Sequence, residues 1–184
     1  MRVTTGLARG RNLEAPQGLD TRPSSDMTKQ AVFNIIQNYV EGCVFLDLFA
    51  GSGQMGIEAL SRGAKQAVFI DSSAKAIEVI KANLKRCSLM EQARVAQMDA
   101  KAFLQSASQK FDIIFLDPPY QKQIIDAVLP LATEKLSEGG IIVCETERNE
   151  TLPQGYGEYT ETKTYLYGKA KVTVYRKAQP EEEE

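Results

Sequence analysis

Short apolar runs alternate with longer segments of mixed polarity from residue 43 to residue 145. Apolar runs without strict alternation are typical of strands that are buried on both faces of a sheet. We therefore predict strands at residues 43–48, 66–70, 93–98, 111–116 and 141–145. Between them, apolar residues recur at helical spacing, which predicts helices at 54–62, 73–86 and 124–136 and a short one ending at 104. This alternation predicts an α/β fold with a mostly parallel sheet covered on both faces.

The chain before residue 43 is predicted to hold a short β extension and one helix. Residues 2–20 are interpreted as short β segments interrupted by glycines and a proline, and a polar loop follows. Ser25 or Asp26 can cap the next helix, which the spacing of apolar residues places at 27–39. Residues 1–25 are therefore expected to form an N-terminal β arm and loop outside the α/β core.

The chain after residue 145 changes character. Residues 156–167 and 170–176 are predicted strands joined by a tight turn at Gly168, so they can only pair antiparallel. This hairpin is expected to complete one edge of the sheet. Because the sequence shows no linker long enough to divide it, we predict a single domain, 1–184, with its core at 26–177 and a disordered acidic tail at 178–184.

Composition narrows the class of protein. The 184 residues are 43% hydrophobic and 25% charged, which is ordinary for one globular domain. No apolar run approaches the ~20 residues of a membrane span and no signal layout opens the chain, so we expect a cytoplasmic protein without a membrane partner. The three separated cysteines fit a reducing compartment. The absence of histidine and of a C-x-x-C pair argues against a metal site and against Ser-His or Cys-His catalysis.

The charge distribution is uneven along the chain. The net charge is −2, but removing the four glutamates at 181–184 changes it to +2. Residues 1–11 contain Arg2, Arg9 and Arg11 and no acidic residue, and Arg22 follows soon after. This asymmetry is compatible with an arm that faces nucleic-acid phosphates, and equally with arginines scattered over the surface.

The predicted strand at 111–116 is followed directly by Asp117-Pro118-Pro119-Tyr120. Each proline fixes φ near −65° and lacks an N–H, and it pushes the residue before it toward extended geometry. The result is a stiff loop that offers a carboxylate, carbonyl oxygens without competing amide donors, and a flat ring. This combination suits an exocyclic NH₂ group on a planar ring, since Asp117 and a carbonyl can accept its hydrogens while Tyr120 stacks on the ring. A proline-rich turn that only ends a strand is the structural alternative.

A glycine loop that includes Phe49, Gly51 and Gly53 follows the first predicted strand and opens a helix. Glycines at such a place let a ligand approach the backbone closely. Gly56 completes the G-x-G-x-x-G spacing of dinucleotide sites. Asp47, just ahead of the loop, argues against a dinucleotide, because its charge would repel a pyrophosphate and attract the ammonium of a methionine-like group.

Two further carboxylates are expected at strand ends. Asp71 closes the second predicted strand, where a carboxylate can accept hydrogen bonds from a ribose diol. Asp99 closes the third predicted strand and offers an acceptor to an adenine amine. Ala100, the next residue, is also a candidate cofactor-binding residue. Ligands of open α/β sheets bind at the carboxyl ends of the strands, so these residues, with Asp47 and Asp117, predict an S-adenosylmethionine site. Asp71 and Asp99 could instead cap the helices that follow them.

The sequence resembles the RsmD family of class I, Rossmann-like methyltransferases over nearly its whole length. The motifs that carry the resemblance are the opening arm at 2–11 with its R-G-R, T-R-P at 21–23, F-A-G-S-G at 49–53, D-P-P-Y at 117–120 and the last hairpin at 167–176. The arm joined to T-R-P is the more specific part, since many amino-methyltransferases share the glycine loop and D-P-P-Y. Ser24 and Gln30 stand where the family usually has Thr and Glu, and both lie outside the predicted chemistry.

The resemblance implies an enzyme that methylates the exocyclic N2 amine of a guanine in 16S rRNA, guanine 966, with S-adenosyl-L-methionine as the donor. On this interpretation the partner is 16S rRNA or a small-subunit ribosomal particle, the chain acts as a monomer, and the RNA contacts are Arg2, Arg9, Arg11 and Arg22. The alternatives that stay open are another amino-methyltransferase acting on nucleic acid, such as an adenine-N6 enzyme, a protein-glutamine methyltransferase, an NAD oxidoreductase and a non-catalytic RNA-binding protein.

Overall fold

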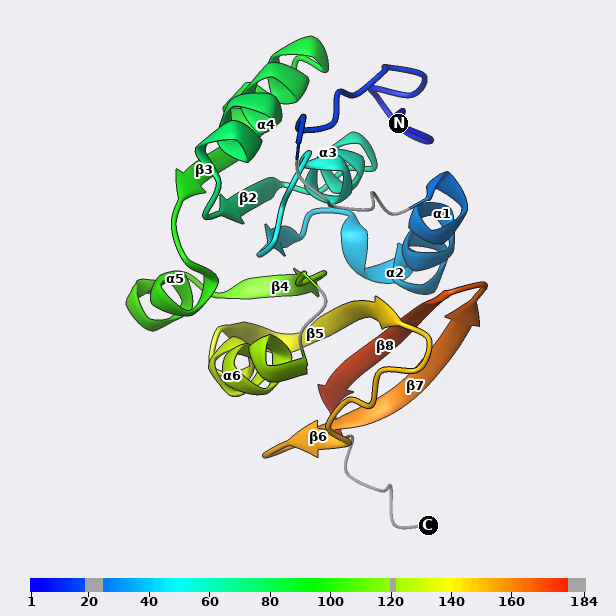
Figure 1. The fold of residues 1–184 in the computed structure, drawn as a ribbon, viewed down its shortest axis with the longest axis vertical. Coiled ribbons are helices and arrows are strands. Elements are labelled where there is room, and N and C mark those ends of the chain that lie inside the picture. Colours follow the sequence, from blue (N-terminus) through cyan, green and yellow to red (C-terminus); the bar gives the residue numbers. More distant parts are fainter. Residues whose placement is uncertain (19–24, 120–121, 179–184) are drawn as a thin grey trace.

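The computed structural model describes residues 1–18, 25–119 and 122–178, and within them the chain folds around one eight-stranded sheet. The strand order is β3-β2-β1-β4-β5-β8-β7-β6 (Figure 1). The strands are β1 Val44–Asp47, β2 Gln66–Asp71, β3 Ala93–Gln97, β4 Phe111–Leu116, β5 Leu136–Glu147, β6 Gly155–Tyr156, β7 Tyr159–Tyr167 and β8 Ala170–Lys177. The helices are α1 Asp26–Ile35, α2 Gln37–Val40, α3 Gln54–Ser61, α4 Ala74–Arg86, α5 Ala100–Ser106 and α6 Lys122–Thr133, with a 3₁₀ turn at Met90–Gln92.

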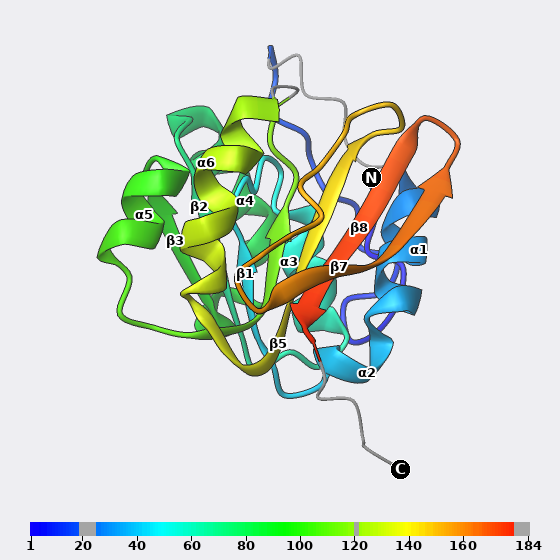
Figure 2. The same ribbon diagram turned by 90° about the horizontal axis from the view of Figure 1, so that it is seen from below.

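Helices cover both faces of the sheet. Helices α1 to α4 pack on one face, where Phe33, Ile57 and Ile80 belong to one buried cluster. Helices α5 and α6 pack on the other face, where Leu104 and Leu129 belong to a second cluster. In Figure 2, α5 and α6 lie to the left of the strands and α1 and α2 to the right. The predicted α/β class is confirmed, and burial from both sides explains why the central strands are almost wholly apolar.

Strands β1 to β5 run parallel, so their carboxyl ends meet at one edge of the sheet. β1 pairs with β2 on one side and with β4 on the other. The strand order therefore reverses between β1 and β4, and ligands of open α/β sheets bind at such a switch point. The glycine loop follows β1, and residues 117–119 follow β4.

The helix predicted at 27–39 is divided in the structure. Ile36 has a ψ of 8°, which leaves the helical region and separates α1 from the single turn of α2. Of the two predicted capping residues, Ser25 serves as the N-cap of α1. Its side-chain oxygen accepts the N–H of Thr28 at 3.1 Å.

Strand β5 is longer than predicted because it includes glycines that the sequence analysis interpreted as a turn. Helix α6 ends at Thr133, and β5 begins at Leu136, where the helix was predicted to end. The pairing of β5 with β4 shifts register between Phe111 and Ile113, and Gly139 has a φ of +74° in this stretch. Glycine adopts such a φ without steric penalty, so the expected turn is a bulge inside the strand.

The C-terminal hairpin is confirmed. Strands β7 and β8 pair antiparallel with Tyr167 opposite Ala170, so only Gly168 and Lys169 form the turn. Strand β8 also pairs antiparallel with β5, and Glu147 lies opposite Ala170. This register places the hairpin turn at the carboxyl edge of the parallel strands.

The N-terminal β extension is limited to one antiparallel bridge between Arg2 and Asn12. The segment is nevertheless well packed, since Val3, Ala8 and Leu13 are buried in the same cluster as α1 and α3. The segment therefore packs on the helices of the core.

The three cysteines are buried and unpaired. Burial raises the pKa of the Cys43 thiol to about 12, so at neutral pH it packs as a small apolar group. None of the helices in the described ranges is long and apolar enough to cross a membrane.

Gly56 lets α3 pack closely on β2, because a Cβ there would lie 2.3 Å from Cε1 of the Phe69 ring. Gly56→Ala is therefore expected to lower the free energy of unfolding by about 1–3 kcal/mol, the usual cost of overpacking, as measured by urea unfolding. Phe69→Leu removes ring atoms, so the double variant should lose less than both single losses together. Full additivity would contradict the close contact as the cause.

Candidate functional site

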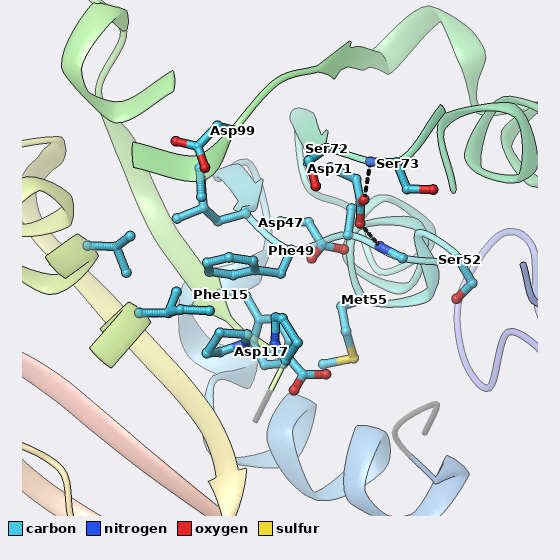
Figure 3. Close-up of a pocket in the computed structure, with 18 of the residues that line it drawn as sticks. Asp47, Phe49, Ser52, Met55, Asp71, Ser72, Ser73, Asp99, Phe115 and Asp117 are labelled. Carbon is cyan, nitrogen blue, oxygen red and sulfur yellow. Dashed lines mark hydrogen bonds between the residues drawn. The ribbon is translucent and has the colours of Figure 1, made fainter. Parts of the chain in front are cut away.

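A pocket of about 640 Å³ opens at the carboxyl edge of the parallel strands (Figure 3). The strands β1, β2, β3 and β4 each end at or near a carboxylate that lines it, namely Asp47, Asp71, Asp99 and Asp117. The acidic strand ends predicted from the sequence are thus brought to one cavity. Helix α6, with Gln123 among others, completes the wall next to Asp117.

The glycine loop is held in place by Asp71. Its Oδ2 accepts the N–H of Gly51 at 2.9 Å, and its Oδ1 accepts the N–H of Ser73 at 2.9 Å (Figure 3). Gly51 and Gly53 have φ values of +56° and +79°, in the left-handed region that favours glycine. A Cβ on Gly51 would meet no atom within 4 Å, so the loop offers an open backbone to a ligand. The N-cap of α4 is Ser73, and Asp71 does not serve as that cap.

Asp47 is the buried carboxylate of the pocket. It is 1% exposed, and its Oδ2 accepts the N–H of Gly56 at 3.1 Å. Burial raises the pKa of its carboxyl group to about 7. A cation bound nearby would lower this pKa again, because an opposite charge favours the carboxylate.

Asp99 serves as a helix cap and also lines the pocket. Its Oδ1 accepts the N–H of Ala102 at 2.9 Å, which caps α5. The capping alternative drawn from the sequence is therefore confirmed, while Asp99 and Ala100 still line the cavity. The two roles are compatible because a carboxylate can accept several hydrogen bonds.

Asp117, Pro118 and Pro119 line the pocket together with Phe49 of the glycine loop. In the view of Figure 3, the ring of Phe49 lies between the carboxylates of Asp99 and Asp117. The predicted acceptor loop and the predicted cofactor loop therefore share one cavity. Tyr120, the predicted stacking ring, lies outside the described residues.

The N-terminal segment forms part of the pocket wall, which the sequence analysis did not predict. Met1, Ala15 and Pro16 line the cavity. The hydroxyl of Ser52, in the glycine loop, donates to Sδ of Met1 at 3.6 Å. The two ends of the segment 1–16 thus lie against the glycine loop.

Asn83 of α4 holds this wall in place. It is fully buried, and its Nδ2 donates to the carbonyl oxygens of Glu14 and Ser52, both at 2.9 Å. Its Oδ1 accepts the N–H of Glu14 at 2.9 Å. One side chain therefore joins the N-terminal segment to the glycine loop. An amide on the otherwise apolar face of a predicted helix was the signal that could have revealed it.

Three of the four predicted RNA contacts, Arg2, Arg9 and Arg11, are not among the residues that line the pocket. Arg2, Arg9 and Arg11 are exposed on the loop that follows Met1, and Arg22 lies outside the described residues. Among residues 1–18, 25–119 and 122–178, no group of three His, Cys, Asp or Glu side chains is placed to hold a metal ion.

The strand order and the ligand pocket at its switch point define a class I methyltransferase fold. Among solved structures, the chain is similar to "Putative methyltransferase yhhF from Escherichia coli", with a TM-score of 0.86 and 30% identity over 97% of this chain and 99% of that one. It is also similar to hypothetical protein TTHA0928 of Thermus thermophilus, with a TM-score of 0.81 and 30% identity over 95% and 98% of the two chains.

Residues 1–176 match the family described as "Conserved hypothetical protein 95", and the chain belongs to this family, the RsmD family. It is 44% identical over 182 residues to "Putative rRNA methyltransferase YlbH" of Bacillus subtilis, covering 96% of this chain and 99% of that protein. It is 35% identical over 158 residues to "Ribosomal RNA small subunit methyltransferase D" of Haemophilus influenzae, covering 83% and 81%. The resemblance drawn from the motifs is confirmed.

The raised pKa of Asp47 predicts a pH-dependent contribution to stability. The folded protein keeps this carboxyl group protonated up to about pH 7, whereas the unfolded chain loses the proton near its ordinary pKa of 3.8. The contribution is therefore complete at low pH and is lost as the pH rises to about 7. Asp47→Asn removes this titration. Between about pH 5 and pH 7, the free energy of unfolding of the variant should therefore rise relative to that of the parent by about 1 kcal/mol per pH unit. A pH-independent difference in urea unfolding would contradict the assignment.

Asn83→Ala removes three hydrogen bonds of a buried amide and leaves the N–H of Glu14 without its partner. The free energy of unfolding should fall by about 2–4 kcal/mol, and the Glu14 amide should exchange hydrogen faster. Arg86→Ala is the matched control, because Arg86 is also on α4 and also contacts Glu14, but at the surface. Its loss should stay below about 1 kcal/mol. Equal losses in the two variants would show that the buried amide has no special role.

Proposed function

We propose that this chain transfers a methyl group from S-adenosyl-L-methionine to the exocyclic N2 amine of a guanine in small-subunit ribosomal RNA. The observation that carries the proposal is that Asp117, Pro118 and Pro119 line the same pocket as Gly51. A methyl donor on the glycine loop and an amine on the Asp-Pro-Pro loop can therefore meet there. The names of relatives, which are rRNA methyltransferases, support the same reaction class.

The residues of the pocket fit the methyl donor. The cavity of about 640 Å³ is within the usual range for small-molecule sites, and Gly51 leaves room for a ligand against the backbone. Asp71 can accept hydrogen bonds from the ribose diol, since its two oxygens have further lone pairs beside those that hold the loop. Asp47 complements a positively charged group, and Asp99 offers an acceptor to the adenine amine.

When bound, S-adenosylmethionine supplies an electrophilic methyl group on a positively charged sulfur. The protein must activate the amine, whose lone pair is delocalised into the base. Hydrogen bonds from the amine to the carboxylate of Asp117 and the carbonyl of Pro118 draw the nitrogen toward tetrahedral geometry. The same acceptors stabilise the positive charge that grows on the nitrogen in the transition state.

The Asp-Pro-Pro loop also fixes the direction of attack. Pro118 and Pro119 have no N–H, so no backbone donor competes for the acceptors around the amine. Alignment of the amine with the methyl group supplies much of the remaining rate enhancement. The N–C bond forms as the S–C bond breaks, and the methylated ammonium is acidic enough to release its proton afterwards.

The target base must leave its stack to reach the pocket. Guanine 966 of 16S rRNA, which the family resemblance implies, is the proposed target, in free rRNA or in a small-subunit particle. The proposed contacts to RNA phosphates are Arg2, Arg9, Arg11 and Arg22, in keeping with their place on the chain before α1.

The carboxyl group of Asp47, next to the glycine loop, disfavours an NAD oxidoreductase. The N–H of Gly56 donates to the buried carboxylate of Asp47, and the missing Cβ leaves room for Phe69. The third glycine of the dinucleotide-like spacing therefore serves the contact between α3 and β2, as it also does in dinucleotide sites, so Gly56 itself does not separate the two classes. A pyrophosphate next to Asp47 would meet a carboxylate where it needs a donor.

Asp117→Ala is expected to lower kcat by at least about 10²–10³-fold, because it removes an acceptor for the charge that develops in the transition state. The Kd for S-adenosylmethionine should stay within several-fold of the parent's. Asp99→Ala, in the same pocket, is the matched control and should raise that Kd while kcat at saturating donor changes little. Donor titration and methylation of small-subunit particles that lack the modification measure both quantities. Normal turnover by Asp117→Ala would refute the mechanism.

The position of the transferred label tests the target. Labelled methyl groups mapped on the rRNA should lie on N2 of a guanine. Label on an adenine N6 would keep the reaction class and replace the target, whereas label on protein would refute an RNA substrate.

A further inference from the structure

A second hollow, of about 170 Å³, lies between the N-terminal loop and α1, and Arg2, Arg9 and Gln30 line it together with the backbone of Gly10 and neighbouring residues. Two arginines and a glutamine thus line one small space. Guanidinium groups match phosphate oxygens in both charge and geometry. We infer that this hollow binds one backbone phosphate of the RNA next to the nucleotide that enters the methylation pocket. The inference rests on the proposed RNA substrate.

The loop that carries the two arginines is held by hydrogen bonds along its backbone. The N–H of Val3 donates to the carbonyl of Arg11 at 2.9 Å, and the N–H of Gly10 donates to the carbonyl of Val3 at 2.8 Å. The carbonyl of Arg2 accepts Nζ of the fully buried Lys29 at 2.5 Å. A site whose backbone is fixed before binding loses less entropy when it takes its ligand.

Glu58 of α3 fixes the next part of the loop. Its carboxylate accepts the N–H groups of Thr4 and Thr5 at 3.0 and 3.1 Å and the hydroxyl of Thr4 at 2.5 Å. Nζ of Lys29 lies 3.5 Å away and Nε of Arg62 3.0 Å away. Glu58 and Lys29 are both 0% exposed, and such a pair is tolerated only when further hydrogen bonds satisfy its charges. Here the loop backbone supplies them.

Most hydrogen-bond donors of the Arg2 and Arg9 guanidinium groups are available to a ligand. Within the described ranges, the guanidinium of Arg9 makes no ion pair or hydrogen bond. Arg2 has Asp26 near its Nε, at 4.0 Å, and both side chains are substantially exposed, so this ion pair is weak. The rim of the hollow is thus positively charged and open to an anion.

The hollow lies beside the methylation pocket. Met1 lines the pocket and Arg2 lines the hollow, and consecutive Cα atoms are only ~3.8 Å apart. On this inference, an RNA strand that places one base in the pocket brings a neighbouring phosphate to the hollow.

Arg11 belongs to a different surface. Burial raises the pKa of Cys87, the C-cap residue of α4, and the nearby charge of Arg11 partly offsets that effect. Arg11 therefore lies near the end of α4, whereas Arg9 shares its hollow with Gln30 of α1. We expect Arg2 and Arg9 to act together on one phosphate and Arg11 to act independently.

The test measures binding of a fluorescent small-subunit rRNA transcript between about 50 and 400 mM KCl. One phosphate contact contributes about 0.7–0.9 to the slope of log K against log salt, which corresponds to about five- to eightfold in affinity at 0.1 M salt relative to 1 M salt. Arg2→Ala and Arg9→Ala should each lose most of this contribution. Because both act on the same phosphate, the double variant should lose far less than the product of the single losses, and its slope should fall by about one.

The controls separate this pair from other charges. The affinity losses of Arg9→Ala and Arg11→Ala should multiply in the double variant, because the two arginines act independently. Lys65 is an exposed lysine just before β2, at the opposite edge of the sheet, and Lys65→Ala should leave the salt slope unchanged. Independent losses for Arg2 and Arg9, or an unchanged slope, would overturn the shared phosphate site. The Kd for S-adenosylmethionine verifies that each variant is folded. A parent chain that shows the expected slopes but transfers no methyl group would refute the reaction proposed above and still support this inference.

Discussion

The pairing of β1 with β4 is the constraint on which the site depends. Asp47 lies opposite Phe115 in this register, and the N–H of Leu48 donates to the carbonyl of Phe115 at 3.2 Å. The chain therefore leaves both strands at the same level, with neighbouring strands about 4.8 Å apart. Because β1 and β4 are central and buried on both faces, the distance between the glycine loop and Asp117 is set by the core of the protein.

The segment before α1 connects the two proposed binding surfaces. On one side, Met1 and Pro16 form part of the pocket wall, held through Asn83. On the other side, the loop from Arg2 onward is held by Glu58. Helix α3 begins at the glycine loop and carries Glu58, so the proposed donor site and the proposed RNA surface are built on the same helix. A shift of α3 would therefore displace residues of both the donor site and the RNA surface.

Much of the fold could be predicted because the central strands follow a regular pattern. The prediction for β4 agrees with the structure at both ends, and those for β1, β2 and β3 are within one residue. The gathering of Asp47, Asp71, Asp99 and Asp117 in one pocket was also predictable, since parallel strands bring their carboxyl ends to one edge.

Contacts between distant parts of the sequence could not be predicted. Asn83 and Glu14 are 69 residues apart, and no local pattern indicates that they pair. The start of β5 was missed for a local reason, because a bulge at Gly139 has the same glycine signature as a turn. The dual role of Asp99 was missed because capping and pocket lining were treated as alternatives.

The buried charges of Lys29 and Glu58 connect the N-terminal loop to two helices. Loss of either charge alone would leave the other uncompensated inside the protein. Relatives should therefore exchange positions 29 and 58 together, and a lineage with apolar residues at both should anchor its first residues in another way. Covariation at these two positions would indicate that relatives hold this loop in the same way.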